Sequence, residues 1–164
     1  IASNIGSKPY PCGNIDLDSS YDKNMPTYHS YSMANRICSQ QVKGCTRQRV
    51  FAIMLSEDRF ITPTTSSDPV QDCKVRTLSL GNPIISSINR NTFSVTNYTQ
   101  KGHIFYPGRV TRQIISDNGY ISVYTVGEGT GDWPWINKNI GADVWNGADS
   151  RLSLKVRLIL SSEN

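Results

Sequence analysis

The chain has 164 residues, of which 37% are hydrophobic and 18% charged, a size that suits one domain with a buried core. Its formal net charge of +4 comes from 17 basic and 13 acidic residues scattered along the chain. No basic cluster is interleaved with aromatic residues and no apolar run approaches about 18 residues, which argues against a nucleic-acid partner and against a membrane span.

Residues 1–35 predict an irregular N-terminal arm, because Pro, Asn, Ser and Asp recur there without a sustained period. Residues 36–164 are expected to form the β-rich body of the same single domain. Cys12 is expected to tether the arm, which has little apolar surface of its own. A start at Ile1 is what a cleaved precursor or an excised domain would show.

Four cysteines, all in the first half of the chain, predict two disulfides at Cys12, Cys38, Cys45 and Cys73. Their spacing fits neither paired zinc ligands nor a redox motif, so no metal is expected. Three connectivities remain open, and four buried free thiols are the alternative. Oxidised pairs indicate a secreted protein in an extracellular or periplasmic compartment.

The body begins with a short amphipathic helix, for which Thr46 is the candidate N-cap and Leu55 the last apolar position. The segments 73–80 and 82–98 then read as strands, since β-branched residues alternate between Gly and Asn. Residues 108–127 predict a hairpin, because Asn118-Gly119 supplies the positive φ angles of a tight turn.

Two further elements complete the chain. Residues 134–145 place apolar side chains at i,i+4 spacing and indicate a weak short helix. Residues 152–160 alternate apolar and polar side chains with a period of two, which predicts a terminal strand. The whole predicts an α+β or mainly-β fold: a twisted antiparallel sheet or partly closed barrel, one short helix and a disulfide-tethered arm.

A candidate hydrolytic site gathers at the open end of the hairpin. The hairpin brings Arg109 close to Glu128, with His103 a few residues upstream. In this hypothesis His103 is the general acid or base and Glu128 its partner, while Arg112 and Arg109 stabilise an anionic transition state. No cofactor is needed. The alternative is that these are surface charges and that His103 bonds neighbouring backbone.

The segment that follows the hairpin offers a second candidate site. Its glycines, Gly127, Gly129 and Gly131, lack the spacing and the lysine of a phosphate-binding loop. Indole faces and short polar side chains suit a sugar ring, although indoles also fill cores. The glycan-binding candidates are Trp133, Trp135, Trp145, Asp132 and Asn137.

Residues 95–149 resemble C-terminal effector modules of bacterial polymorphic toxins of the Rhs type. The resemblance covers about a third of the chain and is carried by Gly102, His103, Pro107, Gly108, Arg112, Glu128 and Thr130. It implies secretion and antagonism without specifying a reaction. The partners it implies are a target-cell substrate and a cognate immunity protein.

The sequence therefore predicts a secreted effector or toxin-like module with a metal-independent hydrolytic site, although whether the chain is an enzyme stays open. The alternative function is a carbohydrate-binding lectin or adhesin domain that uses the tryptophan segment. Pilus-tip lectin domains are similar in length, in disulfide content and in their alternating terminal strands, but no motif is shared and the helix at Thr46–Leu55 is unexpected in such a sandwich.

Overall fold

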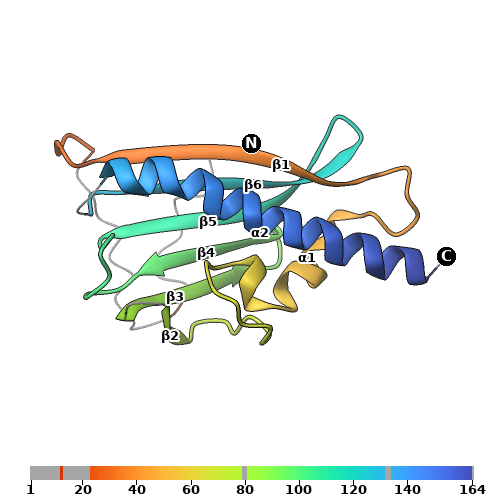
Figure 1. The fold of residues 1–164 in the computed structure, drawn as a ribbon, viewed down its shortest axis with the longest axis horizontal. Helices are drawn as coiled ribbons and strands as arrows, with labels where there is room; N and C mark the ends of the chain where they lie inside the picture. The colour runs from red at the N-terminus through yellow and green to blue at the C-terminus, as the bar shows by residue number, and fades with distance from the viewer. Residues whose placement is uncertain (1–11, 13–22, 79–80, 132–133, 164) are drawn as a thin grey trace.

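The structure, a computed structural model, describes residues 12, 23–78, 81–131 and 134–163, and the side chains of residues 134–140 lie outside this description. Six antiparallel strands form one open sheet in the order β1-β6-β5-β4-β3-β2. Helices cover one of its faces (Figure 1). The strands are β1 (His29–Ser39), β2 (Val75–Leu78), β3 (Asn82–Asn89), β4 (Ser94–Thr99), β5 (Gly108–Asp117) and β6 (Tyr120–Gly129).

The predicted hairpin is confirmed as β5 and β6, which are joined by a two-residue turn. Asn118 has φ 49° and Gly119 has φ 79°, the left-handed pair that such a turn requires. The pairing runs from Asp117 opposite Tyr120 to Gly108 opposite Gly129, so the two strands pair along their full length. The predicted strand at 82–98 is likewise a hairpin, in which β3 pairs with β4.

The short helix is also confirmed, as α1 (Arg47–Leu55). Thr46 caps it, because its hydroxyl oxygen accepts a hydrogen bond from the Arg49 amide at 3.2 Å. One face of α1 is buried against the sheet and includes Val50, Phe51 and Met54. A 3₁₀ turn, η2 (Asp58–Phe60), follows directly.

The prediction of a terminal strand at 152–160 is wrong. These residues form the second half of α2 (Pro134–Ser162), a helix of 29 residues that also contains the predicted weak helix at 134–145. Leu152, Val156 and Leu160 are spaced at i,i+4 and are buried, whereas Leu154 and Leu158 are 54% and 61% exposed. The same apolar residues fit a period of two and a helical period, and the helical period places the buried ones on the face that packs against the sheet. No helix of the described residues is long and apolar enough to cross a bilayer.

The core lies between the helix-covered face of the sheet and helices α1 and α2 (Figure 1). Val95, Ile114, Ile121 and Val123 project from adjacent strands into this layer. Alternate residues of each strand share a face, so the register of the sheet fixes which side chains reach the helices. β1 begins at His29, within the range that was expected to be irregular.

Both disulfides are present. Cys12 pairs with Cys73 and ties the N-terminal region to the segment that precedes β2. Cys38 pairs with Cys45 and closes the loop between β1 and α1. This connectivity is one of the three that the sequence left open.

Candidate functional site

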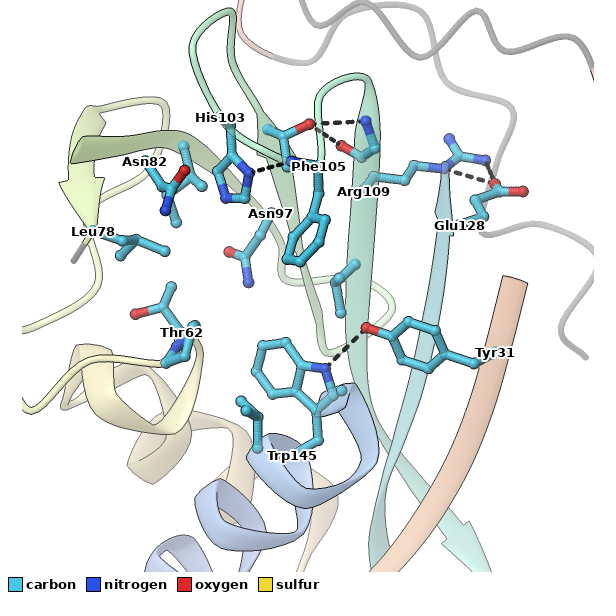
Figure 2. Close-up of a pocket in the computed structure, with 17 residues that line it drawn as sticks. Tyr31, Thr62, Leu78, Asn82, Asn97, His103, Phe105, Arg109, Glu128 and Trp145 are labelled. Carbon is cyan, nitrogen blue, oxygen red and sulfur yellow. Dashed lines mark hydrogen bonds and ion pairs between the residues drawn. The ribbon is translucent and has the colours of Figure 1, made fainter. Parts of the chain in front are cut away.

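A cavity of about 310 Å³ opens between the helix-covered face of the sheet, α2 and the loop after η2. We call it the sheet–helix cavity; Figure 2 shows the residues that line it. Most of its lining is aliphatic or aromatic, and a few polar groups are placed among them. The lining residues used below are Tyr31, Thr62, Leu78, Asn82, Ile84, Asn97, His103, Phe105, Arg109, Val110, Glu128, Gly141, Val144 and Trp145.

One wall is built from Tyr31 of β1 and Trp145 of α2. The indole Nε1–H of Trp145 donates to the Tyr31 hydroxyl at 3.0 Å (Figure 2). The Tyr31 ring fits because Gly127 and Gly141 lie against it: an added Cβ would lie 2.3 Å from the ring at Gly127 and 3.3 Å at Gly141. Burial raises the pKa of Tyr31, so its hydroxyl stays protonated near neutral pH.

The glycines at the end of β6 and just after it allow close packing. A Cβ on Gly129 would lie 2.7 Å from the Pro107 carbonyl oxygen, and one on Gly131 would lie 2.4 Å from the Phe105 carbonyl carbon. Such distances are incompatible with any larger residue unless the backbone moves. The glycines therefore let β1 and the β4–β5 loop approach β6.

His103 lies in the loop between β4 and β5 and faces the cavity (Figure 2). The Phe105 amide donates to His103 Nδ1 at 3.0 Å, and the Ile104 amide donates to Asn82 Oδ1 at 3.1 Å. These bonds fix the loop against β3. Burial lowers the pKa of His103 from its ordinary value of 6.5 to about 4, so the imidazole is neutral near neutral pH.

Arg109 and Glu128 are brought together as the hairpin predicted. They are opposite one another in the register of β5 and β6, and Arg109 Nε donates to Glu128 Oε1 at 2.9 Å. The Tyr28 hydroxyl donates to Glu128 Oε2 at 3.1 Å. Figure 2 shows both charged groups directed away from His103, on the far side of Phe105. The carboxylate of Glu128 is therefore held by Arg109 and Tyr28.

Arg112 does not join His103, Arg109 and Glu128, as the candidate hydrolytic site required, but lies in the core. Its side chain is fully buried, and its guanidinium donates to Asp149 Oδ1 at 2.5 Å, to Thr125 Oγ1 at 2.9 Å and to the Phe60 carbonyl at 2.9 Å. Burial lowers the pKa of Arg112, and the Asp149 carboxylate opposes that shift. Arg112 lies three positions after Arg109, an odd interval, so the two side chains project from opposite faces of β5.

Arg112 also supports the cavity wall from behind. Its guanidinium carbon lies 4.6 Å from the centre of the Trp145 ring. Asp149, one helical turn after Trp145, accepts a second hydrogen bond, from Asn35 Nδ2 at 2.8 Å. The buried pair thus joins α2 to strands β1 and β5 immediately beside the cavity.

The segment after α1 forms another wall and is held by polar groups of the sheet. Arg76 of β2 forms a two-pronged ion pair with Asp58, at 2.9 and 2.7 Å. Asn97 Nδ2 donates to the Ile61 carbonyl at 2.8 Å, and the Asn97 side-chain oxygen accepts from Ser86 at 2.5 Å. Thr62 is thereby placed at the cavity surface.

Among the glycan-binding candidates, Trp145 is the one whose side chain the structure describes. It is 5% exposed and lines the sheet–helix cavity. Asp132 and Trp133 lie outside the described residues, as do the side chains of Trp135 and Asn137.

Sequence reasoning missed Tyr31, Asn82, Asn97, Phe105 and Asp149 as residues of the site or its support. Tyr31 stood in a segment expected to be irregular, and the other four belong to β3, β4, the β4–β5 loop and α2, in which no local motif marks them as parts of one site. The glycines at 127 and 141 are the one sequence signal of a close approach, and they do not identify what approaches them.

No protein-family model and no curated protein matches the chain. Solved structures with similar backbones include Ara h 8.0201, at 10% identity and a TM-score of 0.44 over 76% of this chain and 97% of that one. The ginseng major latex-like protein 151 from Panax ginseng aligns at 10% identity and a TM-score of 0.45, over 76% and 94% of the two chains. A point mutant of norcoclaurine synthase from Thalictrum aligns at 9% identity and a TM-score of 0.45, over 79% of this chain and 95% of that one. Similarity at this level carries no argument about function.

Proposed function

We propose that the protein binds a small, largely apolar molecule in the sheet–helix cavity. One observation carries this proposal: a volume of about 310 Å³ is enclosed mainly by aromatic and aliphatic side chains, with few polar groups among them. That volume lies at the lower end of the roughly 300–1,000 Å³ usual for ligand pockets, and the lining has their usual character.

The walls support binding because they are held in place before a ligand arrives. Tyr31 is fixed between two glycines and Trp145, and the buried Arg112–Asp149 pair lies directly behind that indole. A preformed cavity loses little conformational entropy when it is filled, so most of the apolar contact energy contributes to affinity.

Binding of the uncharged dye N-phenyl-1-naphthylamine, which fluoresces when removed from water, tests the proposal. We expect saturable binding of one dye per chain. Val144→Phe, which fills the cavity from α2, should weaken binding roughly tenfold or more. Leu158→Phe is the matched control on the same helix, because Leu158 is 61% exposed and far from the lining, and its affinity should equal that of the wild type.

Two results would contradict the proposal: no saturable binding to the wild type, or equal affinity in the Val144→Phe variant. Circular dichroism of each variant shows whether the fold is retained, so a loss of binding can be assigned to the cavity.

Hydrolysis by a toxin-like module and glycan binding by the tryptophan segment stay predictions. Proton abstraction by His103 is disfavoured, because its Nδ1 lone pair accepts a hydrogen bond from the Phe105 amide and burial lowers the pKa of the imidazole, which makes it a weaker base. Secretion is proposed on the two disulfides, which persist in oxidising compartments.

A further inference from the structure

The tautomer of His103 is set by its neighbour. The Phe105 amide can only donate, so Nδ1 at 3.0 Å must accept and carries no proton. A neutral imidazole holds its one proton on the other nitrogen, Nε2. At neutral pH the ring therefore presents an N–H donor on the edge opposite Phe105.

That donor faces the cavity without an acceptor. Figure 2 shows the imidazole pointing into the space between Asn82 and Asn97, with the edge opposite the Phe105 bond inward. Within the described part of the chain, the His103 side chain makes one hydrogen bond, which it accepts at Nδ1 from the Phe105 amide. A partly buried N–H in an apolar cavity gains free energy when a ligand supplies the missing acceptor.

The neighbouring polar groups of the lining are already engaged. Asn82 Oδ1 accepts from the Ile104 amide, and the Asn97 side chain bonds both Ser86 and the Ile61 carbonyl. The Thr62 hydroxyl donates to the Asp58 carbonyl at 3.2 Å. These bonds hold the loop after β4 and the segment after α1, so at this end of the cavity the Nε2–H of His103 is available to a ligand.

The charges of the described lining also exclude an ionised ligand. Arg109 and Glu128, the acidic and basic residues of the described lining, form an ion pair with one another and are directed away from His103 (Figure 2). An anion or a cation in the cavity would lose its hydration without gaining a partner of opposite charge.

We propose that the sheet–helix cavity selects uncharged molecules that carry a carbonyl oxygen, which accepts the Nε2–H of His103. This inference rests on the proposed function and adds the class of ligand. A flat keto or aldehyde compound of one or two rings has both the apolar body and the acceptor that the walls require.

Two naphthalenes of nearly equal shape test the inference. 2-Acetylnaphthalene carries the carbonyl, and 2-isopropenylnaphthalene has a methylene group in place of that oxygen. Each displaces N-phenyl-1-naphthylamine from the wild type, and we expect the ketone to bind roughly fivefold to tenfold more tightly, as one net hydrogen bond predicts.

Two substitutions of His103 test whether the preference for the ketone depends on the Nε2–H donor. His103→Asn keeps an oxygen near the position of Nδ1 for the Phe105 amide but removes the donor at Nε2, so both naphthalenes should bind equally. His103→Gln extends an amide N–H to about the position of Nε2 and should restore part of the preference. The comparison within each variant is unaffected by a general loss of affinity.

Equal affinities of the wild type for the two naphthalenes would overturn the inference and leave the proposed function standing. An undiminished preference in His103→Asn would overturn it as well. Failure of N-phenyl-1-naphthylamine to bind at all would overturn the proposed function and this inference together.

Discussion

The indole of Trp145 and the hydroxyl of Tyr31 are joined by a hydrogen bond of 3.0 Å that connects α2 to the edge strand β1. The phenol ring lies against Gly127 of β6 on the way to this contact. Helix, edge strand and hairpin are thus coupled through one side chain, and the same side chain forms a wall of the sheet–helix cavity.

Tyr31→Phe should lower the free energy of unfolding by about 1–3 kcal/mol, because it leaves the buried indole N–H of Trp145 without its acceptor. Urea unfolding followed by circular dichroism measures the change. Tyr124→Phe is the matched control: no hydrogen bond of the Tyr124 hydroxyl occurs within the described residues, and the change should stay within about 0.5 kcal/mol. Equal effects of the two substitutions would contradict this role of Tyr31.

Gly127→Ala should destabilise the fold by about 1–3 kcal/mol or more, since the new methyl group would lie 2.3 Å from the Tyr31 ring. Gly147→Ala is the opposite case. A Cβ there meets only the end of the Arg151 side chain at 3.5 Å, inside helix α2, and should stabilise by up to about 1 kcal/mol. Thermal unfolding of the two variants should move in opposite directions, and a Gly127→Ala variant as stable as the wild type would show that the contact with Tyr31 is unimportant.

Asp149→Ala should cost about 3–5 kcal/mol, because it leaves the fully buried Arg112 guanidinium without its counter-charge. Replacing both partners, Arg112→Met with Asp149→Leu, should recover much of that loss. The exposed pair of Arg49 and Glu163 is the control, and Glu163→Gln should change stability by about 0–1 kcal/mol. A small effect of Asp149→Ala in urea unfolding would mean that water reaches Arg112.

The stability of the wild type should fall as the pH drops from about 6.5 towards 4 through His103. The pKa of this imidazole is about 4 in the folded chain and 6.5 in its ordinary state, so the unfolded state takes up the proton first and is favoured in that window. His103→Asn lacks this contribution. Its stability relative to the wild type should therefore improve between about pH 7 and pH 4 in urea unfolding, and parallel pH profiles would contradict the low pKa.

Much of the fold was readable from local signals. The hairpin follows from Asn118-Gly119, and the start of α1 follows from the hydroxyl of Thr46, because turn and cap chemistry is local. The error at 152–160 arose because apolar residues at every second position include a set at i,i+4. Only packing against the sheet distinguishes Leu152, which is buried, from Leu154, which is exposed.

The site was less accessible to sequence reasoning. The pairing of Arg109 with Glu128 follows from the register of one hairpin and was predicted. The separation of Arg112 from that pair also follows from strand parity, which the prediction did not apply. The approach of Tyr31 to Trp145 joins elements over 100 residues apart, and it depends on tertiary packing that no local pattern encodes.

Chemical-shift mapping tests the central claim, that a ligand occupies the space between the sheet and α2. In ¹⁵N-labelled protein titrated with N-phenyl-1-naphthylamine, we predict that the amides of Phe105, Val110 and Val144 and the indole N–H of Trp145 shift together and saturate at one equivalent. Shifts confined to the exposed Leu154 and Leu158, or no saturable shift at the Trp145 indole, would contradict the account.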